Sequence, residues 1–272
     1  MTQAAQYTHG HHESVVRSHS WRTAQISCAY LLSSLTPNMH ILDVGCGPGT
    51  ITADLAKLVP EGHVTGIERS AEDVLQVARD QAAAQGISNI TYAIDDVLSL
   101  SFPDNSFDVV HAHQVLQHVS DPVLALKEMY RVAKPGGIVA ARDTDFSAMA
   151  WYPETEGIFL WRKTHIQVAR ANGGEPDSGR RLLSYALEAG IPKGQITASA
   201  STWCYSTAEE VIWWSSTWAD RVLLSTFAST AVERGFATQE NLDEMSRAWK
   251  FWGAQPDAWF SLLHGEILCR KG

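Results

Sequence analysis

A glycine-rich segment around residue 45 limits the fold of this chain more than any other feature of its sequence. Residues Leu42–Thr50 read Leu-Asp-Val-Gly-Cys-Gly-Pro-Gly-Thr, between the short apolar run Met39–Val44 and the helical pattern Thr50–Leu58. Glycines permit positive φ angles and let a backbone approach a ligand closely, and the first turn of a helix offers free N–H groups to an anion. The segment therefore predicts a ligand-binding turn between a β-strand and a helix.

Strand-like and helix-like patterns alternate on both sides of this turn. Short apolar runs are typical of buried strands, and apolar residues three and four positions apart are typical of amphipathic helices. Their alternation favours a parallel, doubly wound α/β sheet. Strands are expected at Met39–Val44, His63–Ile67, Ile90–Ile94, Phe107–Ala112 and Gly137–Arg142, and helices at Thr50–Leu58, Ala71–Gln85 and Pro122–Val132, the last with Asp121 as its N-cap.

The second half of the chain is predicted to be mainly helical and is rich in tryptophan. Nine of the ten tryptophans lie between residues 151 and 259, so this half is expected to form a pocket. Helices are expected near Glu154–Ala171, Gly179–Ala189 and Thr207–Trp252, and strands at Gln195–Trp203 and Ala258–Cys269.

Charge and composition limit the partners of the chain. The 272 residues carry a formal net charge of −9, which repels nucleic acid phosphates and favours a small-molecule substrate. A hydrophobic content of 45% with 19% charged residues is typical of a soluble globular protein, and no apolar run approaches the roughly 18 residues of a membrane span. The N-terminal residues do not resemble a secretory signal, so we expect a cytoplasmic protein that binds neither nucleic acid nor membrane. The oligomeric state is left open.

The spacing of cysteine and histidine does not indicate a metal site or a disulfide. The cysteines contain no C-x-x-C pair, and the N-terminal histidines lie in a polar segment without metal-site spacing. We therefore expect reduced thiols and no metal. The residues concerned are Cys28, Cys46, Cys204 and Cys269, and His9, His11 and His12.

Three details indicate which ligand the glycine turn binds. Against the dinucleotide pattern G-x-G-x-x-G, the third glycine position falls on Thr50. Asp43 precedes the turn, where a carboxylate repels a pyrophosphate but suits a ligand with an ammonium and a sulfonium. Glu68 ends the second expected strand and Asp95-Asp96 the third, which places carboxylates for ribose hydroxyls and an exocyclic amine. The set favours a cationic nucleoside.

At this point the sequence resembles the class I S-adenosylmethionine-dependent methyltransferases, and among them the ubiquinone/menaquinone-biosynthesis type. The resemblance covers roughly residues 20 to 145. It implies a Rossmann-like sheet of seven strands with the last one antiparallel, and one structural domain in three parts: an N-terminal lid and helix (1–36), a cofactor-binding core (37–148), and the rest of the sheet with a helical substrate cap (149–272). The matching segments are Leu42–Thr50, Gly66–Ser70, Asp95–Val97, Phe102–Val110, Val115–His118 and Arg131–Gly137.

The resemblance also implies roles for individual residues. The backbone of Gly45–Gly49 would hold the methionine part of S-adenosylmethionine, Glu68 the ribose, and Asp96 with Val97 the adenine. Arg22 is a candidate clamp for the cofactor carboxylate. The predicted cofactor-binding residues are Arg22, Asp43, Gly45, Cys46, Gly47, Gly49, Glu68, Arg69, Asp95, Asp96, Val97, His113 and Gln114.

Several of these residues have a simpler interpretation. Asp43 could tie the turn to neighbouring backbone, Glu68 could cap a helix, and His113 and His118, the candidates for a catalytic role, could be ordinary half-buried histidines. The basic residues between Arg162 and Arg181 are expected on a solvated helix face. An aromatic wall for an apolar acceptor is predicted, with core packing as the alternative, from Tyr7, Trp21, Trp151, Tyr152, Trp213, Trp214 and Trp218.

The expected reaction is an in-line methyl transfer in which the protein supplies proximity, alignment and exclusion of water. The catalytic residue is left unknown, because no unambiguous base stands outside the cofactor motifs. This favours an acceptor that ionises easily, such as a thiol or a phenol. A further resemblance to fungal methyltransferases of secondary metabolism, which S-methylate dithiol toxins of the gliotoxin type, agrees with a thiol.

Other functions remain open from the sequence alone. C- or O-methylation of a quinone, sterol or phenolic natural product, and N-methylation, use the same fold. A nicotinamide-dependent oxidoreductase would use a similar turn, but the chain lacks the third glycine and a Tyr-x-x-x-Lys relay. A protein that binds the cofactor without catalysis would keep the same cofactor residues.

Overall fold

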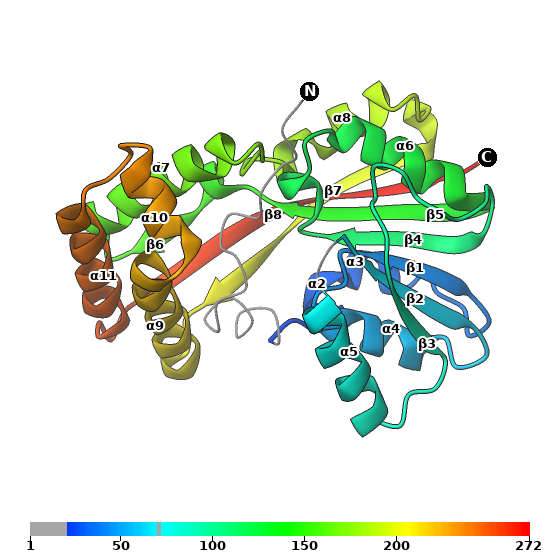
Figure 1. Ribbon diagram of the computed structural model, residues 1–272, viewed down its shortest axis with the longest axis horizontal. Helices are drawn as coiled ribbons and strands as arrows, with labels where there is room; N and C mark the ends of the chain where they lie inside the picture. Colours follow the sequence, from blue (N-terminus) through cyan, green and yellow to red (C-terminus); the bar gives the residue numbers. More distant parts are fainter. Residues whose placement is uncertain (1–20, 70–71) are drawn as a thin grey trace.

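The computed structural model describes residues 21–69 and 72–272, which form a central sheet with helices on both faces and a helical cap at one end (Figure 1). The strands are β1 (His40–Val44), β2 (His63–Glu68), β3 (Ile90–Ile94), β4 (Phe107–His113), β5 (Ala133–Thr144), β6 (Ala150–Tyr152), β7 (Ile196–Tyr205) and β8 (Trp259–Arg270). The α-helices are α2 (Ala24–Ser27), α3 (Ala29–Leu32), α4 (Thr50–Leu58), α5 (Glu72–Ala84), α6 (Pro122–Val132), α7 (Glu156–Ala171), α8 (Leu182–Glu188), α9 (Ala208–Leu224), α10 (Thr226–Glu233) and α11 (Gln239–Gly253).

The eight strands of the described chain form one sheet in the order β3-β2-β1-β4-β5-β8-β6, with β7 on β8. The pairs β1–β2, β2–β3, β1–β4 and β4–β5 are parallel, whereas β8 is antiparallel to β5, β6 and β7. The predicted doubly wound sheet with an antiparallel last strand is therefore confirmed.

The strand count differs from the prediction by one. The additional strand, β6, has three residues and pairs with β8 at Trp151↔Phe260. A strand this short shows no alternation of apolar and polar residues, so its sequence carries no signal. β5 also begins earlier than expected, at Ala133 instead of Gly137, because the parallel partner Phe107 of β4 pairs with Ala133.

Two apolar clusters cover the two faces of the parallel part of the sheet. On one face, Ile41, Val109 and Ile138 pack with residues of α2 to α4 such as Leu55. Alternate residues of the same strands point to the other face, where Leu42 and its neighbours pack against α6 and α8. The predicted N-cap of α6 is present, since Asp121 accepts a hydrogen bond from the Leu124 amide at 2.8 Å. Both faces are thus closed, and the carboxyl ends of β1, β2 and β4 meet at one edge of the sheet.

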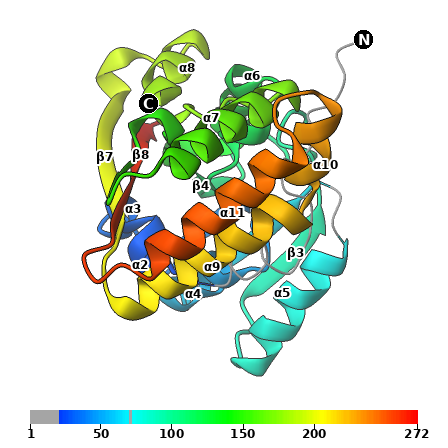
Figure 2. The same cartoon turned by 90° about the vertical axis from the view of Figure 1, so that its left-hand side faces the viewer.

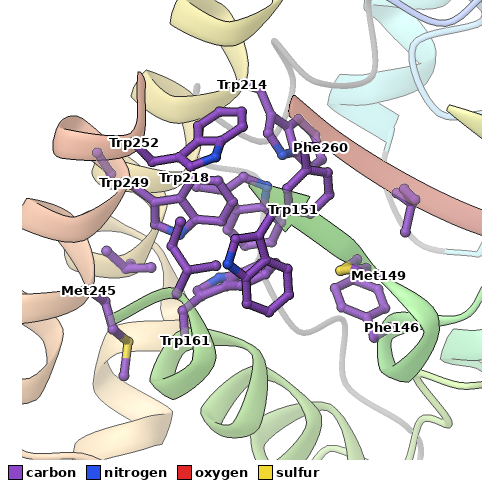
Figure 3. Close-up of a cluster of buried hydrophobic side chains, with 14 of the residues drawn as sticks. Phe146, Met149, Trp151, Trp161, Trp214, Trp218, Met245, Trp249, Trp252 and Phe260 are labelled. Carbon is purple, nitrogen blue, oxygen red and sulfur yellow. The ribbon is translucent and has the colours of Figure 1, made fainter. Parts of the chain in front are cut away.

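A third cluster forms the core of the cap, in which α9 and α11 lie side by side (Figure 2). Trp161, Trp249 and Trp252 are fully buried there, with edge-to-face contacts at ring-centroid distances of 4.9 Å between Trp161 and Trp249 and 5.7 Å between Trp249 and Trp252. Trp249 and Trp252 also contact Phe260 of β8, with ring centroids 5.7 and 6.1 Å apart (Figure 3). β8 therefore carries both the sheet and the core of the cap.

Candidate active site

The glycine turn follows β1 and adopts the backbone that its sequence predicts. Gly45, Gly47 and Gly49 have φ angles of 64°, 53° and 79°. A Cβ on Gly45 would lie 2.5 Å from Cγ2 of Val115, and one on Gly49 would lie 2.8 Å from Cβ of Ala78. A side chain would therefore meet both a conformational and a steric barrier at these two positions.

Glu68 ends β2 and reaches across to this turn. Its Oε1 accepts a hydrogen bond from the Gly47 amide at 2.7 Å. The side chain is partly exposed and lies at the edge where the parallel strands end. A carboxylate in this position suits the two donating hydroxyls of a ribose.

Asp43 lies behind the turn and not in it. It is 3% exposed, and its two oxygens accept hydrogen bonds from Thr52 Oγ1 and His111 Nδ1, each at 2.7 Å. These contacts join β1 to α4 and β4. They agree with the simpler interpretation of Asp43, in which it ties the glycine turn to neighbouring segments. Direct contact between Asp43 and a ligand stays a prediction.

The acidic pair after β3 shapes a second turn. Asp95 Oδ2 accepts from the amide and hydroxyl of Ser101 at 3.1 and 2.9 Å, and Asp96 Oδ1 accepts from the Leu98 amide at 2.9 Å. Val97 is buried beside them. Arg69 is exposed and Cys46 is buried within the glycine turn. The contact of these residues with adenine or ribose remains a prediction.

A chain of polar side chains starts before α2 and crosses the end of β4. Arg22 Nη2 donates to Gln114 Oε1 at 2.6 Å, and the Gln114 amide lies 2.9 Å from His264 Nε2. His264 Nδ1 lies 3.1 Å from the Leu262 carbonyl, which fixes the proton on Nδ1 and leaves Nε2 to accept from Gln114. Gln114 has a φ of 56°, an uncommon value for a residue other than glycine. The structure thus brings together two predicted cofactor-site residues that are far apart in the sequence, Arg22 and Gln114, and one residue that was not predicted, His264.

His113 lies directly beside this chain. It is 6% exposed, and neither ring nitrogen has a hydrogen-bond partner within residues 21–69 and 72–272. Burial, together with the charges of Arg22 and Arg142, holds its pKa well below the ordinary value. Burial and Arg22 also lower the pKa of His118 to about 4, and the Gln117 amide lies 3.0 Å from its Nε2. Both candidate catalytic histidines are therefore neutral at neutral pH.

An aromatic wall continues from His113. Trp21 contacts Trp203, Tyr205 and Trp213, with ring centroids 5.5, 5.6 and 5.4 Å apart. The rings of His113 and Trp203 have centroids 5.6 Å apart. Trp203 and Tyr205 were missed as candidate site residues. Their alternate positions on β7 were the available signal, but only the register of β7 on β8 turns them towards His264 and Trp21.

Of the other residues predicted for the acceptor pocket, Trp214 adjoins this wall and stacks on Tyr205 with ring centroids 4.4 Å apart. Trp151, Trp214 and Trp218 are buried in the core of the cap (Figure 3), in the same apolar cluster as Trp203 and Tyr205, which agrees with the core-packing alternative. Tyr152 is 57% exposed on β6. Tyr7 lies outside the described residues. Their contact with an acceptor stays a prediction, and the structure gives it no support at Tyr152.

The described residues contain no group of three or more His, Cys, Asp and Glu side chains that could hold a metal ion. Over the same part of the chain, no helix is long and apolar enough to cross a membrane.

Comparison with known proteins identifies the family. Residues 35–173 match the family model described as a methyltransferase domain. An uncharacterized methyltransferase of Schizosaccharomyces pombe is 35% identical over 272 residues, which cover 97% of this chain and 96% of that protein. The chain belongs to this methyltransferase domain family.

Two further comparisons concern part of the chain and its fold. A demethylmenaquinone methyltransferase of Listeria monocytogenes is 42% identical over 106 residues, which cover 39% of this chain and 44% of that protein. The solved structure of the YcgJ protein from Bacillus subtilis superposes with a TM-score of 0.58 at 18% identity, over 91% of this chain and 99% of that one. At this identity the structural likeness concerns the fold alone.

The predicted enzyme class and cofactor are confirmed: the chain is an S-adenosylmethionine-dependent methyltransferase. The residues of the methyltransferase fit this cofactor. The turn contains glycines at which an added Cβ would clash with neighbouring side chains, and the Glu68 carboxylate lies beside the turn. The neutral His113 and Arg22, both predicted to contact the cofactor, lie around Gln114 at the end of β4.

Proposed function

We propose that this methyltransferase transfers a methyl group to a small aromatic or apolar acceptor that binds between the glycine turn and the wall formed by Trp21, Trp203, Tyr205 and Trp213. The observation that carries the proposal is the position of His113. Its ring lies next to Trp203 and next to His264 of the Arg22–Gln114–His264 chain, with ring centroids 5.6 and 6.2 Å apart. Polar groups for the cofactor and apolar surface for an acceptor therefore meet at one residue.

The chain's own residues would divide the cofactor between them. The backbone of Gly45–Gly49 would hold its methionine part, Glu68 its ribose and Asp96 with Val97 its adenine. Arg22, positioned by Gln114, would bind its carboxylate through charge-assisted hydrogen bonds. When bound, S-adenosylmethionine supplies an activated methyl group on a sulfonium, so alignment and exclusion of water are the main tasks left to the protein.

His113 would accept the proton that the acceptor releases. Its ring nitrogens have no partner within the described residues, and its depressed pKa keeps the imidazole neutral and able to accept. An imidazole with so low a pKa is a weak base, which fits an acceptor that gives up its proton easily. We therefore propose a thiol or a phenol, with C- or O-methylation of a quinone, sterol or other phenolic compound as the alternative.

The cofactor part of the proposal is tested by isothermal titration of the protein with S-adenosylhomocysteine. We expect Glu68→Ala to weaken binding by tenfold or more, because the loss of hydrogen bonds to a charged group costs roughly 1.5–3 kcal/mol. The matched control is Glu188→Ala, which removes an exposed carboxylate on α8 that bonds Ser184. Equal affinities for the two variants would place the ribose away from Glu68.

A further inference from the structure

Arg142 is a buried arginine in which two of the three side-chain nitrogens have no hydrogen-bond partner among the described residues. It lies on β5, where it pairs in register with His113 of β4 and with Glu266 of β8. Its side chain is 1% exposed, and its Nε donates to Ser201 Oγ at 3.1 Å and to Glu266 Oε1 at 3.2 Å. Nη1 and Nη2 are buried without a hydrogen-bond partner in the part of the chain that the structure describes.

The contacts of Glu266 do not account for these free nitrogens. Glu266 accepts hydrogen bonds from Ser199 Oγ, Ser201 Oγ and Nε of Arg142. It therefore bonds only the Nε edge of the guanidinium and neither Nη1 nor Nη2. Burial lowers the pKa of Arg142 to about 10, which leaves it a cation at neutral pH. A buried cation with two unsatisfied nitrogens is costly, and native proteins satisfy nearly all such groups with protein, water or ligand.

Other buried polar groups near Arg142 also lack a partner. Within residues 21–69 and 72–272, the ring nitrogens of His113 have no hydrogen-bond partner, and neither has the buried hydroxyl of Tyr30 on α3, which is close enough to Arg142 for each to affect the pKa of the other. The indole of Trp203 lies 4.9 Å from the guanidinium carbon and borders the aromatic wall. Most of these free groups are donors, and the two nitrogens of Arg142 form a fork. A carboxylate is the small group that accepts from such a fork with both of its oxygens.

We propose that Arg142 is a specificity residue which binds a carboxylate of the methyl acceptor, so that the acceptor is an aromatic acid with a methylatable thiol or phenol. This inference rests on the proposed function. The carboxylate lies at Arg142, the ring of the acceptor lies along Trp203 and the wall, and the group that receives the methyl faces His113. Arg22 remains the residue for the carboxylate of the cofactor.

The test uses the protein saturated with S-adenosylhomocysteine and titrated with two probes, 4-mercaptobenzoate and 4-hydroxybenzoate. Each probe is compared with its methyl ester, which has the same ring but no negative charge. We expect the acids to bind the unaltered protein more tightly than the esters. In Arg142→Met the acids should lose tenfold or more in affinity while the esters change little, because the charge-assisted pair is worth roughly 1.5–3 kcal/mol.

Two further variants make the result specific. Arg162→Met is the matched control, since Arg162 lies 4.9 Å from the ring of Trp151 in the cap and should not affect the acids. Glu266→Gln removes the negative charge that partly neutralises Arg142 and should tighten binding of the acids. If Arg142→Met does not fold, Arg142→Lys keeps the charge without the fork and should still weaken the acids severalfold.

The outcomes separate this inference from the proposed function. Failure of the unaltered protein to bind S-adenosylhomocysteine would overturn the proposed function itself. Normal cofactor binding with no preference for the acids over the esters would overturn only the role of Arg142. A loss of S-adenosylhomocysteine affinity in Arg142→Met, with the acids unaffected, would assign Arg142 to the cofactor and overturn the inference as well.

Discussion

Asp43 lies at the centre of a buried set of hydrogen bonds that joins β1, β4 and α4 at the start of the glycine turn. In Asp43→Asn one of the two oxygens becomes an NH₂ group, which cannot accept from both Thr52 and His111. We expect a loss of about 1–3 kcal/mol in the free energy of unfolding, measured by urea denaturation. The control Asp80→Asn alters an exposed carboxylate that bonds Gln76 on the same helix.

The same variant distinguishes support from ligand contact. If Asp43 acts through the turn, the affinity for S-adenosylhomocysteine falls only as far as the turn is disturbed, and stability falls with it. Unchanged stability together with a large loss of affinity would show instead that the carboxylate contacts the ligand.

His118 makes stability depend on pH in a definite direction. Its pKa is lowered by burial from the ordinary 6.5 to about 4 in the folded chain. Between these values the unfolded chain binds a proton that the folded chain does not, so lowering the pH from 6.5 towards 4 favours unfolding, by up to about 3 kcal/mol at the acid end. Above pH 6.5 the residue is neutral in both states and contributes no pH dependence.

His118→Gln should therefore flatten the decline in stability below pH 6.5, as measured by urea denaturation between pH 4.5 and 7.5. His165, which burial gives a pKa of about 3, is left in place and maintains part of the slope. The exposed His40 supplies the control His40→Gln. A slope identical in His118→Gln and the unaltered protein would contradict the lowered pKa of this half-buried imidazole.

The elements that could be predicted from the sequence are those whose signal is local. The glycine turn, the end of β2 at Glu68 and the N-cap Asp121 each follow from a few consecutive residues. β6 could not be predicted, because three residues carry no periodic signal and are held in place only by β8. Cap helices were predicted as one stretch, whereas the structure divides them at Ser225 and Thr238, which cap α10 and α11.

The site residues that were not predicted were missed for a different reason. Arg142, Trp203 and His264 lie on three strands, and they meet because β8 pairs with β5 on one edge and with β7 on the other. The Trp203 indole donates to the Ile26 carbonyl at 2.8 Å, a contact between residues 177 positions apart. Such proximity follows from strand register, which a single sequence does not contain. The sequence therefore located the turn and the acidic residues but only Trp21 and Trp213 of the aromatic wall.

At the scale of the whole molecule, β8 joins two cores that could otherwise unfold separately. Its residues pair with β5 in the sheet, and Phe260 of the same strand lies among the cap tryptophans. A ligand at the glycine turn should therefore stabilise the cap as well. At 100 times its Kd, S-adenosylhomocysteine adds about 2.7 kcal/mol to the free energy of unfolding. Tryptophan fluorescence reports mainly on the cap, and circular dichroism reports on the whole chain.

Gly265→Ala tests this coupling at the middle of β8. A Cβ there would lie 1.9 Å from the carbonyl oxygen of Gly179, so the strand must move, whereas a Cβ at the control position Gly194 meets nothing within 4 Å. We expect Gly265→Ala to lower the free energy of unfolding by about 2 kcal/mol or more, as overpacking of a core does, and by the same amount whether fluorescence or circular dichroism is followed. Gly194→Ala should leave both values unchanged. In the unaltered protein both transitions should rise equally with S-adenosylhomocysteine. If the fluorescence transition of the cap does not shift when S-adenosylhomocysteine is added, β8 connects the two cores without coupling their unfolding.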